Sequence, residues 1–204
     1  MMEIRETMVN MKKMLVATAV PLTVLTSPLG LAQDVEVTFT ADIKAATCQI
    51  TLSGDNVSGS TTSGYTMMMP EVPLRYIKQK TANQAQAHFK LKAEYCTADL
   101  SKISMTITPG RVSTYSPLYL ASNELTGAGT AKWVGMGFKR KSTSGDSFIK
   151  LKQGTEAGDS VVWSSGEKSS GLDMTLVLRE TSTDYGGGQT GSFKASATFG
   201  FTYE

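Results

Sequence analysis

Residues 191–204, GSFKASATFGFTYE, carry the clearest structural signal in this chain of 204 residues. Apolar residues occupy the odd positions, and polar residues or glycine occupy the even ones. An alternation with a period of two is typical of a strand that buries one face. Chain ends usually fray and are polar, so a terminal strand this regular predicts a partner that holds it. The apolar positions are Phe193, Ala195, Ala197, Phe199, Phe201 and Tyr203.

The same alternation recurs upstream, and turn-forming residues separate the runs. No window keeps the three-to-four spacing of an amphipathic helix over more than two turns. The stretch 53–64 is rich in Ser, Gly, Thr, Asp and Asn and predicts turns, and 139–142 is expected to open a loop. Short strands separated by turns indicate a β-sandwich. The predicted strands lie at 35–43, 49–52, 89–95, 103–107, 133–138, 148–151 and 174–178.

The composition agrees with strands and excludes several functions. The 26 Thr, 21 Ser and 19 Gly favour strands and turns over helices. A net charge of +2 lacks the electrostatic signature of a general nucleic-acid binder. A structural zinc site needs about four ligands, and the chain has one His and two Cys, so we expect no metal and no cofactor. His88 has no evident acid or nucleophile partner, which predicts a protein that is not an enzyme.

The first 32 residues read as a signal peptide. Lys12 and Lys13 precede an apolar run over 14–25, and Gly30 and Ala32 form a small-x-small cleavage site. Met11 is an alternative start that gives a leader of conventional length. A buried helix of the mature fold is the competing interpretation. No later apolar stretch predicts a membrane span, so we expect an exported domain over 33–204.

Export predicts that the two cysteines form a disulfide. Disulfides persist in oxidising compartments, and Cys48 and Cys96 allow only one pairing. The bridge would close a loop of about 49 residues and stabilise the fold by roughly 4 kcal/mol. A redox-active pair is the competing interpretation, but such pairs usually have Cys-x-x-Cys spacing. The sequence therefore favours a structural disulfide.

Four segments of the chain resemble the chaperone–usher fimbrial subunits, or pilins, of Gram-negative bacteria. The first is Val37-Thr38-Phe39 leading into Ala45-Ala46-Thr47-Cys48, and the second is Phe89-x-Leu91 running into Cys96 and on to Ile107. The third is the Gly-interleaved strand Val134-Gly135-Met136-Gly137-Phe138. The fourth is the C-terminal pattern, in which Gly191 lies fourteenth from the end and Tyr203 is penultimate.

This resemblance implies an incomplete immunoglobulin-like sandwich that lacks its final strand. A partner would complete it by β-augmentation: first a periplasmic chaperone, then the N-terminal arm of the next subunit, at an outer-membrane usher. In this interpretation residues 33–43 are the donor arm, with Val35, Val37 and Phe39 as donor residues. The residues that line the groove and bind the chaperone would be Gly191, Phe193, Ala195, Ala197, Phe199, Phe201 and Tyr203. The protein would be a structural subunit of an adhesive surface fimbria.

One departure from the family pattern leaves the position in the fibre open. Only 33–36 precede Val37, and this stretch lacks the glycine that family arms usually carry. The alternative is a minor, tip-proximal or single-domain adhesive subunit that binds a host glycan or protein through loops 111–130 or 139–147. Lys139-Arg140-Lys141 would then contact anionic glycans; a solvated loop is the competing interpretation. Similarly, Met67-Met68-Met69 is either a contact surface or a buried strand end.

Overall fold

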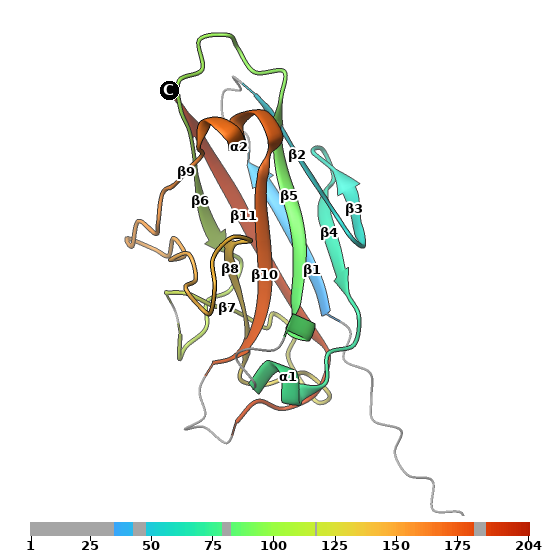
Figure 1. Cartoon of the computed structure of the whole chain (residues 1–204). Helices are drawn as coiled ribbons and strands as arrows, with labels where there is room; N and C mark the ends of the chain where they lie inside the picture. Colours follow the sequence, from blue (N-terminus) through green and yellow to red (C-terminus); the bar gives the residue numbers. More distant parts are fainter. Residues whose placement is uncertain (1–34, 43–47, 79–82, 117, 182–186) are drawn as a thin grey trace, which may run out of the picture. The chain divides into compact units, whose positions relative to one another are not determined.

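The computed structural model describes residues 35–42, 48–78, 83–116, 118–181 and 187–204 (Figure 1). The chain divides into a leading unit, Met1–Gly30, and a second unit, Leu31–Glu204. The predicted signal peptide and its cleavage site lie outside the described residues. Everything below concerns the second unit.

Two sheets make up nearly all the regular structure, and the helices are short (Figure 1). The first sheet has the order β3 (Val57–Ser60), β4 (Gly64–Met69), β1 (Val35–Asp42), β11 (Phe193–Tyr203), β6 (Ile103–Pro109) and β9 (Val161–Val162). The second has the order β2 (Gln49–Gly54), β5 (Gln86–Glu94), β10 (Leu172–Glu180), β8 (Val134–Arg140) and β7 (Ala121–Ser122). The helical pieces are α1 (Leu74–Lys78), α2 (Ser165–Ser170) and a 3₁₀ turn, Asn83–Ala85. The predicted all-β, immunoglobulin-like sandwich is confirmed.

The first and last strands pair in an unusual direction. β1 runs parallel to β11, whereas every other ladder between strands in the described residues is antiparallel. Parallel neighbours cannot be joined by a tight turn, which suits two strands from opposite ends of the chain. β1 therefore joins its sheet between β4 and β11 without a hairpin to either neighbour.

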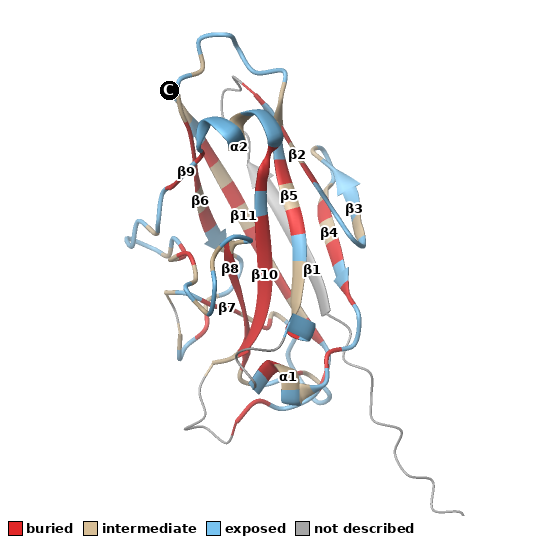
Figure 2. Cartoon of the chain, in the orientation of Figure 1, coloured by how far each residue is buried: buried red, intermediate tan, exposed pale blue. Residues whose placement is uncertain are grey.

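An aromatic cluster joins the two sheets at the centre of the core. Phe89 on β5, Phe138 on β8 and Phe199 on β11 contact one another edge to face, with ring centroids 5.6–6.4 Å apart. All three are buried, and Figure 2 shows burial alternating along β11 while it covers most of β10. Edge-to-face pairs stabilise a core beyond the area that they bury. The predicted alternation of the last strand thus places its large residues in the centre of the sandwich.

The glycines of β8 allow loops to cover the outer face of its sheet. A Cβ at Gly137 would lie 2.8 Å from the Phe148 ring and 2.9 Å from Leu120 Cδ2. At Gly135 a Cβ would meet Leu120 Cβ at 2.9 Å. A side chain at either position would displace this packing, so the Gly-interleaved pattern reflects close approach by a covering loop.

Three local expectations are wrong. Residues 53–64 hold the end of β2, all of β3 and the first residue of β4 as well as turns; β3 is an exposed edge strand, so it shows no apolar alternation. Lys139 and Arg140 belong to β8 rather than to a loop. The predicted strand at 148–151 is not formed, although the Ile149 amide donates to the Phe138 carbonyl oxygen at 2.8 Å.

Candidate functional site

The predicted groove residues lie on β11 and face the core. Phe193, Ala195, Ala197, Phe199 and Phe201 are buried, and Tyr203 is partly buried. Their intervening neighbours are intermediate or exposed. One face of this strand therefore supplies apolar lining, while both of its edges must find backbone partners.

The edge of β11 that faces away from β1 is occupied along its length. β6 pairs with it from Ala197 to Tyr203. Before that point the Glu124 amide donates to the Lys194 carbonyl oxygen at 2.7 Å, and the Gly110 amide donates to the Ser196 carbonyl oxygen at 2.9 Å. The Ser196 amide in turn donates to Glu124 Oε1 at 2.9 Å. Only the opposite edge of β11 depends on β1.

β1 fills a slot between β4 and β11, which we call the strand slot. Val35 to Asp42 pair with Phe193 to Gly200 on one side. On the other side Val35 to Phe39 pair antiparallel with Met69 to Tyr65. Without β1, two strand edges would face each other with unpaired amides and carbonyls, which is a template for another strand. The predicted donor residues and the predicted groove strand are therefore neighbours within one chain.

The sequence did not predict the opposite wall of the strand slot, although a strand end was one interpretation of the methionine run that ends β4. β4 buries Met67 and Met69 and exposes Met68, so the methionine run is a strand rather than a contact surface. Its signal was the alternation Tyr65, Met67, Met69. The three consecutive methionines concealed that period, because Met68 is apolar yet faces outward.

The predicted disulfide is present and lies beyond β1. Cys48, which is buried, bonds Cys96 and ties the start of β2 to the residues after β5. The bond therefore holds strands of the second sheet and does not cross-link β1. Among the described residues, the two neighbouring backbone ladders are what attach β1 to the sandwich.

The end of β11 is tied to the loop before β6. The carbonyl oxygen of Glu204 accepts from the amides of Ser101 and Lys102 at 2.7 and 2.9 Å. The Glu204 side chain pairs with the Lys102 ammonium at 2.7 Å. Nearby, the buried Tyr203 hydroxyl has no hydrogen-bond partner among the described residues, and burial raises the pKa of Tyr203. These contacts fix the C-terminal end of the groove strand.

Asn123 fixes the other end of β11 and was also not recognised from the sequence. Its buried amide donates to the carbonyl oxygens of Ala131 and Ser192, each at 2.9 Å. Its side-chain oxygen accepts from the amides of Leu125 and Lys194 at 3.1 and 3.0 Å. An isolated Asn in a polar loop reads as turn material, so only the tertiary contacts reveal this role.

Gly191 lies where β11 begins and passes close to the same loop. Its φ is +148°, and a Cβ would lie 2.5 Å from the Gly129 carbonyl oxygen and 2.6 Å from the Ala131 amide nitrogen. Both are backbone atoms, so a larger residue would push the loop away. The position therefore requires glycine for the chain to enter β11.

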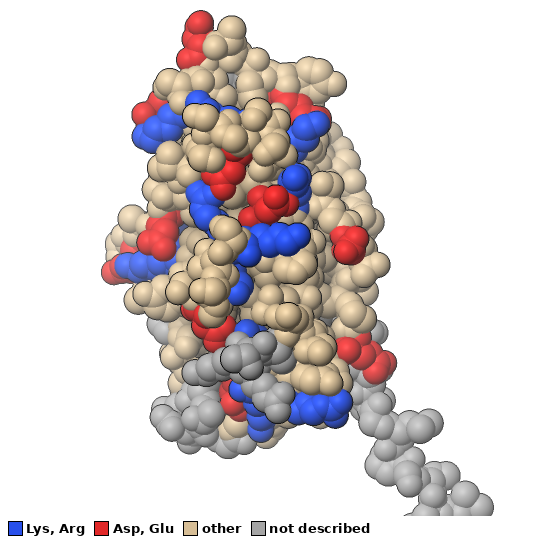
Figure 3. Space-filling model, viewed as in Figure 1, with Lys and Arg blue, Asp and Glu red and all other residues tan. Residues whose placement is uncertain are grey.

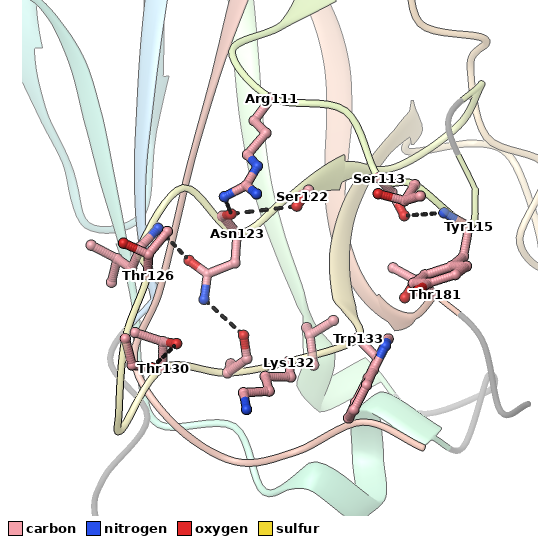
Figure 4. A pocket seen from close by; sticks show the side chains of 15 residues that line it. Arg111, Ser113, Tyr115, Ser122, Asn123, Thr126, Thr130, Lys132, Trp133 and Thr181 are labelled. Carbon is pink, nitrogen blue, oxygen red and sulfur yellow. Dashed lines mark hydrogen bonds between the residues drawn. The ribbon is translucent and has the colours of Figure 1, made fainter. Parts of the chain in front are cut away.

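A hollow of about 360 Å³ lies beside Asn123, within the loop that connects β6 to β8 (Figure 4). Figure 4 shows Arg111 directed at Asn123, whose carbonyl oxygen accepts from the guanidinium at 3.1 Å. Trp133, which has a φ of +52°, and the exposed Tyr115 also line it. A strained aromatic in a loop hollow is a feature of binding surfaces.

Other kinds of site receive no support from the described residues. No group of three His, Cys, Asp or Glu in that part of the chain could hold a metal ion. No described helix has the length and apolar character needed to cross a bilayer.

Comparison with known proteins agrees with the fold. Residues 37–204 match the family described as Fimbrial protein. The chain belongs to this family and is a fimbrial subunit. It is similar to the uncharacterized fimbrial-like protein YadM of Escherichia coli (strain K12), with 39% identity over 183 residues that cover 89% of this chain and 93% of that protein.

Proposed function

We propose that this chain is a structural subunit of a bacterial surface fimbria and polymerises by donor-strand exchange through the chaperone–usher pathway. The observation that carries the proposal is the strand slot, where a strand from the chain's N-terminal side completes the sheet beside β11. An equivalent strand from a chaperone or from another subunit would meet the same two edges. The donor arm is then 33–43, and the acceptor is the buried face of β11.

The energetics favour exchange over an empty slot. Unpaired edges beside buried apolar side chains are costly in water, so the slot is expected to be filled at every stage. Burial of the three donor side chains, Val35, Val37 and Phe39, would contribute very roughly 5–9 kcal/mol before costs. Backbone pairing with β4 and β11 adds to this. Because the arm of one copy enters the next, the contact is heterologous and does not close, which generates filaments.

The partners and route follow from this mechanism. A predicted signal peptide over 1–32 would export the chain to the periplasm, where a chaperone lends the first strand. An outer-membrane usher would then be the site where neighbouring subunits exchange arms. The fimbria at the cell surface would support adhesion. This scheme uses strand pairing and export alone, without a catalytic step or a cofactor.

The decisive experiment removes the chain's own strand. Because the complete chain fills its own slot, we would fuse residues 44–204 to a signal peptide and co-express them in a periplasm with and without a cognate chaperone. We expect soluble protein only with the chaperone. A synthetic peptide of residues 33–43 should then displace the chaperone and form a complex that resists urea. The matched control is the same peptide with Val37→Arg and Phe39→Arg, which should fail to exchange.

Two further variants separate exchange from general misfolding. Phe201→Ser with Tyr203→Ser should lose chaperone-dependent recovery, whereas Thr202→Ser on the exposed face of the same strand should retain it. Recovery of soluble 44–204 in equal amounts with and without chaperone would contradict the proposal. Electron microscopy of cells that lack the chain then tests its place in the fibre, because unchanged fibres would exclude a shaft role.

A second candidate function is adhesion by the subunit itself. The supporting observation is the hollow beside Asn123, which combines Trp133 and Tyr115 with the guanidinium of Arg111. Such a loop could bind a host glycan or protein without affecting the strand slot. Binding of a glycan array by the purified protein, and its loss in Trp133→Ala, would test this role.

A further inference from the structure

A row of polar residues crosses three strands on the outer face of the second sheet. His88 on β5 lies opposite Thr175 on β10, and Thr175 lies opposite Lys139 on β8. His88 Nδ1 and Thr175 Oγ1 are 2.9 Å apart and share a hydrogen bond. Thr175 is 1% exposed and Lys139 is also buried, whereas His88, at the β5 end of the row, is exposed. Figure 3 shows that charged side chains of both signs gather on this face.

Lys139 is a buried cation in this row. It is 6% exposed, and its ammonium donates to the Gly145 carbonyl oxygen at 2.7 Å, where the loop after β8 folds back. Within the described part of the chain it has no carboxylate partner. An ammonium has three donors, and burial of a charge is costly unless it is paired. A negative group that reaches Lys139 would therefore gain more than one that binds an exposed lysine.

The row opens into a hollow of about 470 Å³ whose lining carries positive charge only. His88, Lys139 and Lys141 contribute to it, and no Asp or Glu does. Asp55 and Asp173 act on His88 from outside this lining, and Asp173 lies 3.6 Å from the Lys90 ammonium in the next row. The remaining lining residues are neutral and polar: Asn83, Gln86, Thr143, Ser144 and Gly145.

The titration of His88 reports the same positive field. Partial burial lowers the pKa of His88 most, and Lys141 lowers it next. Asp55 opposes them more strongly than Lys139 assists them, and Asp173 opposes them least. An anion bound in the hollow would reverse the sign of this local field. The pKa of His88 should therefore rise when the hollow is filled.

We propose that this hollow, formed by His88, Lys139, Lys141 and the loop 143–145, binds the sulfate or carboxylate group of an acidic saccharide. The lining contains amides and hydroxyls, which hydrogen-bond sugar hydroxyls, and no aliphatic or aromatic side chain besides the imidazole, which a peptide anchor would need. The inference adds a second site to the adhesive candidate and names a ligand class for that site. It is independent of the strand slot and of the hollow beside Asn123.

His88 makes the test simple, because it is the only histidine in the chain. Its ring signals can be followed by NMR in the folded full-length domain without further assignment. We would titrate with a sulfated disaccharide, with an unsulfated disaccharide that contains a uronic acid, and with neutral lactose, at constant ionic strength. We expect a saturable shift and a raised His88 pKa with an acidic probe, and the probe that produces them identifies the anionic group.

Substitutions test whether the acidic saccharide binds in this hollow. Lys141→Gln should raise the dissociation constant for the acidic probe at least tenfold, and Lys139→Gln should abolish binding of that probe. Lys92→Gln is the matched control, because Lys92 lies on the same face of β5 outside the hollow. Melting temperatures show whether Lys139→Gln still folds; if it does not, Lys141→Gln carries the test. Three outcomes would each overturn the proposal: no saturable shift with either acidic probe, an equal response to lactose, or an unchanged affinity in Lys141→Gln. None of them would bear on the proposal of strand exchange.

Discussion

Val37 lies opposite Ala195 in the parallel ladder that joins the first described strand to the last. The same residue lies opposite Met67 on the other side of its strand. A segment near the start of the chain is thus inserted between two strands that would otherwise share no neighbour.

Replacement of Phe199 by Ala should strongly destabilise the domain. Its ring is buried and packs edge to face against Phe89 and Phe138, so truncation leaves a cavity at the junction of the sheets. We expect a loss of about 3–5 kcal/mol in the free energy of unfolding, measured by urea denaturation. Thr202→Ala on the exposed face of the same strand is the control. A loss below 1 kcal/mol for Phe199→Ala would show that this cluster is not central.

Reduction of the disulfide should lower stability without emptying the slot. Cys48 and Cys96 are separated by 48 residues, and their bond constrains the unfolded chain. We expect Cys48→Ser with Cys96→Ser to lose roughly 4 kcal/mol in urea denaturation. Because the chain has no other cysteine, reductant should change the unfolding of the native protein and leave that of the double variant unaltered. An effect of reductant on the double variant would point to another cause.

Asn123→Ala should loosen the start of β11. Four hydrogen bonds through one buried side chain hold the loop against Ser192 and Lys194, and removal leaves buried backbone groups unpaired. We expect a loss of about 1–3 kcal/mol and faster hydrogen exchange at the amide of Lys194. Thr126→Ala, at an exposed position of the same loop, serves as the control. Unchanged exchange at Lys194 would exclude the proposed role of Asn123.

Protonation of His88 should oppose folding at mildly acidic pH. Burial, Lys141 and Lys139 lower its pKa in the folded state below the ordinary value of about 6.5, so near pH 6 the unfolded chain binds more protons. The contribution of neutral His88 to the free energy of unfolding is therefore fully present above about pH 6.5, and it is lost as the pH falls through the pKa of His88 in the folded state. Urea denaturation between pH 5 and 8 should show this trend in the native protein and a weaker one in His88→Gln.

A second variant gives that prediction a matched check. Lys141→Gln removes a neighbouring positive charge, so the pKa of His88, read from its NMR signals, should rise towards its ordinary value. Lys92→Gln should leave it unchanged. The same pKa in all three proteins would exclude the electrostatic account of His88.

Much of the fold is determined by local patterns in the sequence. The alternation from Phe193 to Tyr203 specifies a strand with one buried face, because side chains of successive strand residues point to opposite sides. A single pair of cysteines in an exported chain specifies one disulfide. The C-terminal pattern and the Gly-interleaved strand together pointed to the fimbrial family. The strand and family inferences depend on residues that are close together in the sequence. The disulfide inference depends on the chain having only two cysteines.

Only the tertiary structure decides which strands become neighbours and in which direction. Val35–Asp42 lies between β4 and β11 and runs parallel to β11. Even its nearest partners on β4 are more than twenty residues away along the chain. Local alternation cannot predict this pairing, because a strand shows the same alternation whether its neighbour is parallel or antiparallel. The hollow on the second sheet arises in the same way, because strand register alone brings His88, Thr175 and Lys139 into one row. Sequence determined which residues could face the core and which could carry charge, whereas packing and register determined what lies beside them.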